Sequence, residues 1–180
     1  MIGSLLKRYM RHWRDETGSA AVEFVLVFPV MATMIVMTLE LGFITLRQTM
    51  LERGLDMAVR EVRLGTGTTI EYDDVKDLVC ENAMIFVDCE NQMTLEMANS
   101  DPRAFAPLDP VAVCTDQPID EQIRPAKTFN PGQANEVVMM RACLNYSPLF
   151  PEALLAGLLT KDSSGDAAIL AVTAFVQEPE

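Results

Sequence analysis

The sequence from Ser19 to Leu46 reads SAAVEFVLVFPVMATMIVMTLELGFITL, and Glu23 and Glu40 are its only charged residues. A helix made of these 28 residues would be ~42 Å long at ~1.5 Å per residue, which exceeds the ~30 Å hydrocarbon core of a bilayer. Sixteen uncharged residues separate the two glutamates, so each carboxylate can lie near one boundary of a membrane. The stretch therefore predicts one transmembrane helix.

The charges on either side of this stretch predict its orientation. Residues 1–18 contain two acidic residues and four basic ones, Lys7, Arg8, Arg11 and Arg14. Residues 54–180 contain eight basic and 21 acidic residues, within a net charge of −12 for the 180-residue chain. By the positive-inside rule, the N-terminus stays in the cytoplasm and the acidic remainder is exported. A body this acidic repels phosphate backbones, which argues against nucleic acid as a partner.

The small residues next to the apolar run indicate how the chain is processed. In an ordinary secretory signal such residues follow the run, whereas here Gly18-Ser19-Ala20-Ala21 precede it, so cleavage would leave the helix attached. A basic leader ending in Gly18, with Glu23 five residues later, resembles class III (type IV-like) prepilins. This resemblance implies cleavage between Gly18 and Ser19 by a prepilin peptidase, after which the new α-amino group of Ser19 could pair with Glu23. The alternative interpretation is a plain single-pass anchor that tolerates a glutamate near its end.

A more specific resemblance rests on several motifs together. The run Ser-Ala-Ala-Val-Glu-Phe from Ser19 to Phe24, followed by Phe28-Pro29 and Glu40-Leu41-Gly42, is similar to the TadE-like family, the minor pseudopilins of the tight-adherence (Tad) pilus. Later segments resemble the same family: Phe129-Asn130-Pro131-Gly132, the run Val137 to Tyr146, and Pro148-Leu149-Phe150-Pro151. The resemblance is strongest over residues 18–42 and weak over residues 95–128.

The resemblance implies a minor pilin required to assemble an adhesive Tad/Flp-type pilus, and hence a role in surface attachment and biofilm formation. Its expected partners are a prepilin peptidase, other Tad pilins and pseudopilins, the inner-membrane assembly platform and membrane lipid. We assign Glu23 to a charge contact in assembly, and helix kinking or packing to Phe24, Pro29, Glu40 and Gly42. Because Glu40 lies near the outer boundary, we expect its replacement to affect assembly less than that of Glu23. The alternative function is a single-pass, membrane-tethered periplasmic binding or assembly-scaffold protein that does not polymerise.

Beyond the membrane, the periodicity predicts an α+β body. Leu51, Leu55, Ala58 and Val62 continue the first helix as an amphipathic one, which ends at the glycines of residues 65–68. Thr68 and Glu71 form a capping-box pattern for a second helix over about 69–83. We expect strands at 93–97, 137–144 and 167–176, a short helix over 150–160, and an irregular proline-rich excursion over 99–135. The predicted domains are a removed leader (1–18), the N-terminal helix (19–64) and a periplasmic body (65–180) with helices on a small antiparallel sheet of about three strands.

All four cysteines, Cys80, Cys89, Cys114 and Cys143, lie on the predicted exported side. An even number in an oxidising compartment predicts two disulfides, and four cysteines allow three pairings. We favour Cys80 with Cys89, closing the second helix onto the following strand, and Cys114 with Cys143, pinning the proline-rich excursion to the central strand. A zinc site with four thiolates is the weaker alternative because the sequence contains no CxxC pair.

The sequence offers little for catalysis. His12, the single histidine, lies in the leader, so the exported body lacks the usual acid/base group near neutral pH. The glycine-threonine run at 65–68 lacks the Gly-Lys-Ser/Thr element of a phosphate-binding loop, and the acidic residues over 73–81 lack EF-hand spacing. We therefore expect no enzymatic activity, no catalytic residues, no cofactor and no metal site.

Overall fold

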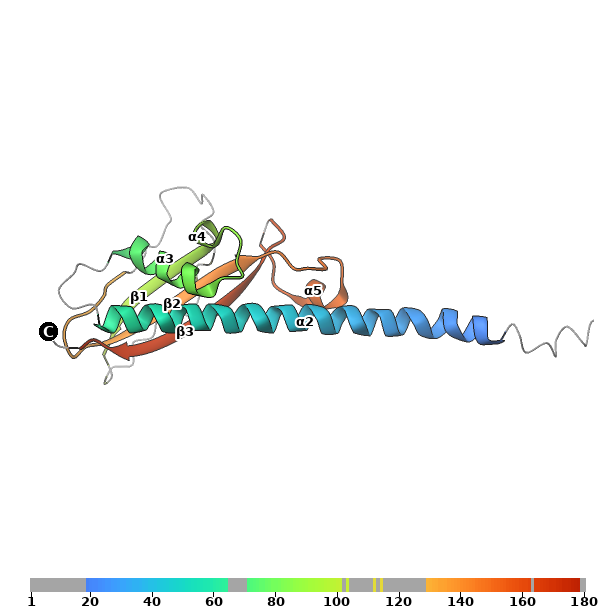
Figure 1. The fold of residues 1–180 in the computed structure, drawn as a ribbon, viewed down its shortest axis with the longest axis horizontal. Coiled ribbons are helices and arrows are strands. Elements are labelled where there is room, and N and C mark those ends of the chain that lie inside the picture. The colour runs from blue at the N-terminus through green and yellow to red at the C-terminus, as the bar shows by residue number, and fades with distance from the viewer. Residues whose placement is uncertain are drawn as a thin grey trace, which may run out of the picture.

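The structure, a computed structural model, describes residues 19–64, 71–101, 103, 112, 114, 129–162 and 164–178. Its longest element is α2 (Ser19–Leu64), a helix of 46 residues. Figure 1 shows that the remaining elements pack along the C-terminal half of α2, while the N-terminal half projects alone from the body. The chain therefore consists of a folded head on a helical stalk, and the stalk continues into the core of the head.

Helix α2 is continuous although its sequence contains a proline. Pro29 is the proline inside it, and the described helix runs through that position. Four threonines also lie within α2, and their hydroxyls donate hydrogen bonds of 2.7–3.1 Å to the carbonyl oxygens four residues earlier: Thr33, Thr38, Thr45 and Thr49. Because these hydroxyls are satisfied within the helix, they need no water, and the apolar stretch keeps its character along its whole length.

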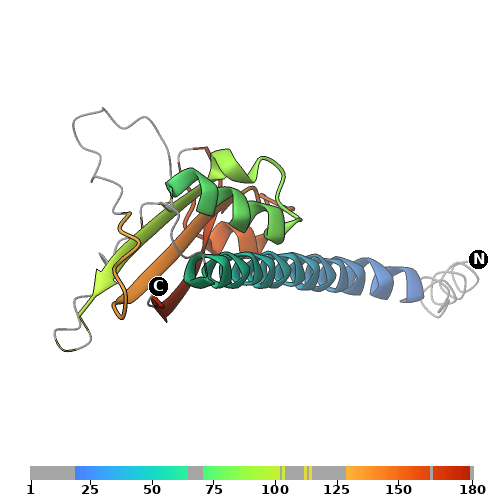
Figure 2. The same cartoon turned by 60° about the vertical axis from the view of Figure 1, so that its left-hand side comes forward.

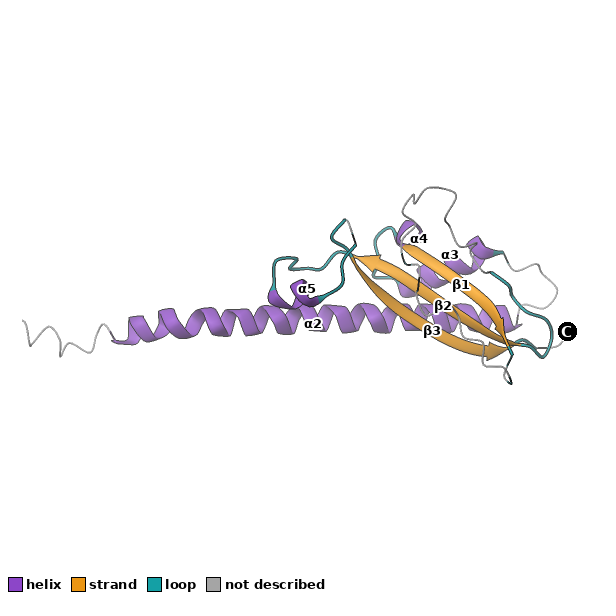
Figure 3. Ribbon diagram, turned by 180° about the vertical axis from the view of Figure 1, so that it is seen from behind, coloured by secondary structure: helices purple, strands orange, loops and turns teal. Residues whose placement is uncertain are grey.

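The head combines a three-stranded antiparallel sheet with two helices that precede the sheet in the chain and a short helix between its last two strands. Along the chain come α3 (Tyr72–Ala83), α4 (Cys89–Gln92), β1 (Met93–Ser100), β2 (Val137–Tyr146), α5 (Leu154–Leu158) and β3 (Ala167–Val176). The strand order is β1-β2-β3, with Leu95 opposite Ala142 and Ala142 opposite Ala171. Figures 2 and 3 show α2 and α3 together on one face of the sheet. This is the α+β architecture that the sequence predicts.

The core lies between that face and the two helices. The apolar positions predicted for the second half of α2 are all buried, and they belong to one core with buried residues of α3 and of every strand. The members of this core include Leu51, Leu55, Ala58 and Val62 on α2, Val75 and Val79 on α3, Leu95 and Met97 on β1, Met140 and Leu144 on β2, and Ile169 and Phe175 on β3. Burying such side chains contributes roughly 1.5–3 kcal/mol each. The second half of α2 is therefore part of the head rather than a linker to it.

Gly54 permits the close approach of α2 and α3. A Cβ atom at this position would lie 2.6 Å from the carbonyl oxygen of Val79 and 3.1 Å from Cβ of Ala83. Since backbone atoms cannot move aside for a side chain, only glycine fits without separating the two helices. The sequence analysis did not single out this residue, because a glycine inside a helical pattern has no distinctive signature of its own.

Several predicted boundaries are wrong in detail. The second helix begins at Tyr72, and Glu71 occupies its N-cap position without a capping side-chain hydrogen bond, so Glu71 does not take its capping-box role; Thr68 lies outside the described residues. The first strand extends to Ser100, because it pairs with β2 along all eight residues. The helix expected over 150–160 is only α5, since Pro151 and a turn closed by Ala153 N–H to the Phe150 carbonyl precede it. Helix α4 was not predicted.

The proline-rich excursion lies mostly outside the described residues, and so do five of its six prolines, Pro102, Pro107, Pro110, Pro118 and Pro125. Its last part is described and runs beside β1. Phe129 bridges to Met97, the Asn130 N–H donates to the Met97 carbonyl at 2.9 Å, and the Phe129 ring meets the Tyr72 ring edge-on at 5.5 Å. The Phe129-Asn130-Pro131-Gly132 motif thus lies along the outer edge of the sheet.

Candidate membrane and assembly site

The N-terminal half of α2 is an uncovered apolar surface. Among the described residues, α2 is the helix that is long and apolar enough to cross a membrane, with a mean hydropathy of 2.2 in its apolar window. Large apolar side chains along it are at least 48 % exposed: Val22, Phe24, Val25, Leu26, Val27, Phe28, Val30, Met31, Met34, Ile35 and Leu39. The head covers none of them, so this surface requires a lipid or protein environment.

The predicted processing and charge positions lie at the free end of this surface. Gly18 lies outside the described residues, and α2 begins at Ser19. Glu23 lies on the second turn and is exposed, so the head provides it no cover. The Phe24 ring stacks on the Phe28 ring with centroids 5.1 Å apart. A carboxylate on an apolar helix surface is costly in hydrocarbon unless it finds a partner, and the described head supplies none.

Pro29 and Gly42, two of the positions assigned to kinking or packing, lie within α2. Pro29 lacks an amide hydrogen and so leaves the helix one hydrogen bond short, although the described α-helix is unbroken there. A Cβ atom built at Gly42 meets nothing within 4 Å, so the head does not require glycine at this position. The assignments of Phe24, Pro29 and Gly42 stay predictions, because their contacts in an assembly lie beyond a single chain.

Glu40 has a role that sequence analysis missed. It is fully buried, and its Oε1 and Oε2 atoms accept hydrogen bonds from the backbone N–H groups of Leu149 (3.1 Å) and Phe150 (3.0 Å). These donors are 109 and 110 residues away in the sequence, in the loop between β2 and α5. The carboxylate therefore ties this loop to α2 at the base of the head. The expectation that its replacement affects assembly less than that of Glu23 stays a prediction. For the stability of the head we expect a large effect, because the substitution would leave two N–H groups without their buried acceptor.

A cationic and an aromatic residue lie close to the same tether. The guanidinium of Arg47, two turns beyond Glu40 on α2, lies 4.7 Å from the ring centroid of Tyr146 at the end of β2. Burial raises the pKa of the Tyr146 hydroxyl above its ordinary value; the charge of Arg47 acts in the lowering direction and that of Glu40 in the raising direction. The phenol thus stays neutral at physiological pH, and a cation–π contact joins α2 to the sheet beside the tethered loop.

The structure confirms both favoured disulfides. Cys80 pairs with Cys89 across a Cα–Cα distance of 5.7 Å, and Cys114 pairs with Cys143 across 5.1 Å. The first joins the end of α3 to the start of α4 rather than directly to the following strand, because α4 intervenes. The second attaches residue 114, inside the proline-rich excursion, to the central strand β2.

The disulfides predict a thiol count that separates them from the zinc alternative. Protein isolated from an oxidising compartment should give close to no alkylatable thiol per chain under denaturing, non-reducing conditions, since all four cysteines are paired. Mass spectrometry after alkylation measures this directly, and reduction before alkylation provides the positive control. Four reactive thiols appearing on denaturation alone would contradict both disulfides.

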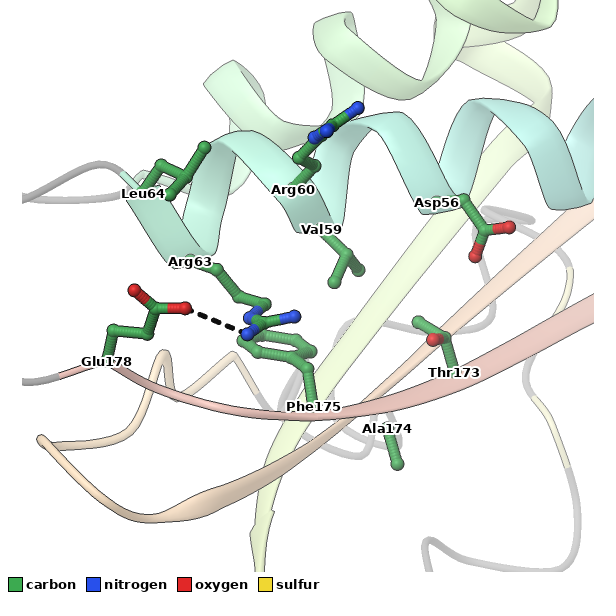
Figure 4. Close-up of a pocket in the computed structure, with 9 residues that line it drawn as sticks. All are labelled: Asp56, Val59, Arg60, Arg63, Leu64, Thr173, Ala174, Phe175 and Glu178. Atoms are coloured by element: carbon green, nitrogen blue, oxygen red, sulfur yellow. Dashed lines mark hydrogen bonds and ion pairs between the residues drawn. The ribbon is translucent and has the colours of Figure 1, made fainter.

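A surface hollow lies at the opposite end of α2, between its last turns and β3 (Figure 4). Nine residues line it: Asp56, Val59, Arg60, Arg63, Leu64, Thr173, Ala174, Phe175 and Glu178. Arg63 Nη2 lies 2.8 Å from Glu178 Oε1, and both side chains are nearly half exposed. Exposed ion pairs of this kind contribute at most ~1 kcal/mol. Its lining contains neither cysteine nor histidine.

The comparisons with known proteins agree with the position of the exposed apolar surface. Residues 18–60 match the family model described as TadE-like protein. The chain carries a TadE-like segment. This segment supports an association of the chain with the Tad pilus. A search of curated proteins and a search of solved structures each found no match.

The TadE-like segment coincides with a structural unit. It starts at Gly18, the residue before the predicted cleavage position, and ends near the last turn of α2. It therefore contains the exposed apolar surface, the Glu40 tether and the core positions up to Val59. The later motifs at 129–132 and 148–151 lie outside the match, and their likeness to the family stays a prediction.

Proposed function

We propose that this chain is a minor pilin, or pseudopilin, required to assemble an adhesive Tad/Flp-type pilus. The observation that carries the proposal is the free N-terminal half of α2: an apolar helix surface of some twenty residues, inside the TadE-like segment, that the head leaves uncovered. A helix of this kind is stable in a bilayer, and it is equally suited to pack among the helices of neighbouring subunits. The disulfide-bonded head would then lie on the outside of the assembly, where attachment to surfaces and biofilm formation take place.

The same arrangement suggests an order of events. The chain inserts with its basic leader in the cytoplasm and its head in the periplasm, held in the inner membrane by α2. A prepilin peptidase removes residues 1–18, and the new Ser19 amine offers a charge partner to Glu23 in the same subunit or a neighbour. At the assembly platform, the helices of other pilins and pseudopilins then replace lipid around α2. This exchange costs little free energy because the surface of α2 is apolar throughout. No step requires an enzymatic activity or a cofactor of the chain itself.

Processing at Gly18 tests the proposal. In a host with an active prepilin peptidase, mass spectrometry of the membrane-resident protein should show the loss of residues 1–18 and an N-terminus at Ser19. A Gly18→Val variant should keep its leader and remain membrane-resident, because the apolar part of α2 is unchanged. An intact Met1 in the unmodified protein, beside normal processing of another prepilin in the same cells, would favour a tethered binding or scaffold protein that does not polymerise.

A further inference from the structure

The position of α5 relative to the apolar stalk carries an inference beyond pilus assembly. The twenty residues from Ala20 to Leu39 precede the buried Glu40, and at ~1.5 Å per residue they cover ~30 Å, the thickness of a hydrocarbon core. Glu40 therefore lies at the level where α2 leaves the hydrocarbon. Any tilt of α2 shortens its projected length and moves this level further toward the C-terminus.

Helix α5 lies at this same level. It packs against α2, and Figures 1 and 3 show it between the sheet and the free half of α2. Val36 and Met37, which precede Glu40 by four and three residues, are half-buried. At the helical rise these two residues lie about 5 Å below Glu40, within the apolar stretch. The lower edge of the head thus meets α2 at the outer end of the span, at Glu40.

Three large side chains at this lower edge are apolar and exposed. Leu149, Leu154 and Leu158 are 46 %, 65 % and 77 % exposed. Leu154 and Leu158 are four residues apart and so lie on one side of α5. Residues 153–160 contain no charged side chain, while Glu152 and Lys161 flank them on either side. An apolar face between charged ends is the pattern of a segment that lies in the membrane interface.

We infer that the segment from Leu149 to Leu158 is a membrane foot, which inserts its three exposed leucines into the outer edge of the bilayer beside α2. Lipid is the occupant that the geometry favours, because this segment is bonded to Glu40, and the neighbours of Glu40 on α2, Leu39 and Leu41, are exposed apolar residues at the level where α2 leaves the hydrocarbon. The Glu40 carboxylate, bonded to the first two residues of the foot, fixes it to the helix. The foot sets the depth of α2 and holds the head against the membrane. This inference rests on the proposed insertion of α2.

Tryptophan quenching in vesicles tests the foot separately from the insertion of α2. Trp13 is the chain's single tryptophan, so the full chain with Trp13→Phe has no tryptophan fluorescence of its own. Single probes are then placed as Leu158→Trp in the foot, Val30→Trp near the middle of the span and Leu64→Trp at the far end of α2, all at exposed positions. Each variant is reconstituted into phosphatidylcholine vesicles whose acyl chains are brominated either near the headgroup or near the methyl end.

If the foot inserts, the Leu158→Trp probe should have blue-shifted emission. Bromines near the headgroup should quench its fluorescence more strongly than bromines near the methyl end. Val30→Trp should be quenched best by the deep bromines. Leu64→Trp, ~36 Å beyond Glu40 along the helix, should not be quenched. Quenched Val30→Trp with unquenched Leu158→Trp would overturn the foot and leave membrane insertion intact. Blue-shifted but unquenched Leu158→Trp would show burial by a second subunit, which also overturns it. Unquenched Val30→Trp would overturn the insertion of α2 and the foot with it.

Discussion

Glu40→Ala should release the loop between β2 and α5 from α2 and destabilise the head. The substitution removes a buried carboxylate and leaves the N–H groups of Leu149 and Phe150 without their acceptor. Hydrogen bonds to charged groups are worth ~1.5–3 kcal/mol each, and an unsatisfied buried donor costs ~1–3 kcal/mol. We expect a net loss of about 3 kcal/mol after partial rehydration, which corresponds to a fall in melting temperature of roughly 6–12 °C for a chain of this size.

Circular dichroism melting of the detergent-solubilised protein measures this loss, and limited proteolysis localises it to residues 147–161. Glu40→Gln keeps one carbonyl oxygen as an acceptor and should lose about half as much. Glu61→Ala, which removes an exposed glutamate from the same helix, is the matched control and should melt like the unmodified protein. An unchanged melting temperature and proteolysis pattern in Glu40→Ala would contradict the tether.

Glu23→Ala should give processed, stable, membrane-resident protein and few or no pili. Glu23 is exposed at the free end of α2, so its removal changes no contact within the described head. Insertion should be unchanged or improved, because a carboxylate in a membrane segment is unfavourable. Its proposed pairing with the mature Ser19 amine is needed only when subunits register against one another. A loss of ~1.4 kcal/mol at each such contact lowers the association constant about tenfold, and repetition along an assembly multiplies the effect.

Pilus counts and immunoblots from the same cells measure this effect. Glu61→Ala, whose exposed carboxylate lies on the head-bound half of α2, should retain normal piliation and serves as the control. Normal piliation by Glu23→Ala would contradict the pairing. Degradation of Glu23→Ala would also contradict it, since that outcome requires a folding role for which the exposed position of Glu23 gives no reason. Glu23 and Glu40 should therefore fail in different assays, the first in assembly and the second in stability.

The features that the sequence alone predicted correctly depend on local patterns. The apolar run predicted the uncovered half of α2, and the spacing of Leu51, Leu55, Ala58 and Val62 predicted the half that enters the core, because helical periodicity is set by neighbours on one helix. Alternating or continuous apolar runs predicted all three strands. Compartment and cysteine number predicted two disulfides, and the favoured pairing is the one found. The motif from Ser19 to Gly42 predicted the family that residues 18–60 match.

Tertiary structure alone decided what Glu40 and Gly54 do, because in each case the partner comes from a segment remote in the chain. A glutamate in an apolar run has the same sequence signature whether it faces a headgroup or the backbone of a loop 109 residues later. In the sequence, Gly54 looks like any glycine in a helix. Only the packing of α3 shows that a Cβ at this position would lie 2.6 Å from the Val79 carbonyl oxygen. The position of α5 along α2 depends likewise on tertiary structure, because α5 connects two strands of the sheet that packs on α2. No local sequence pattern indicates how far a short apolar helix lies from a membrane boundary.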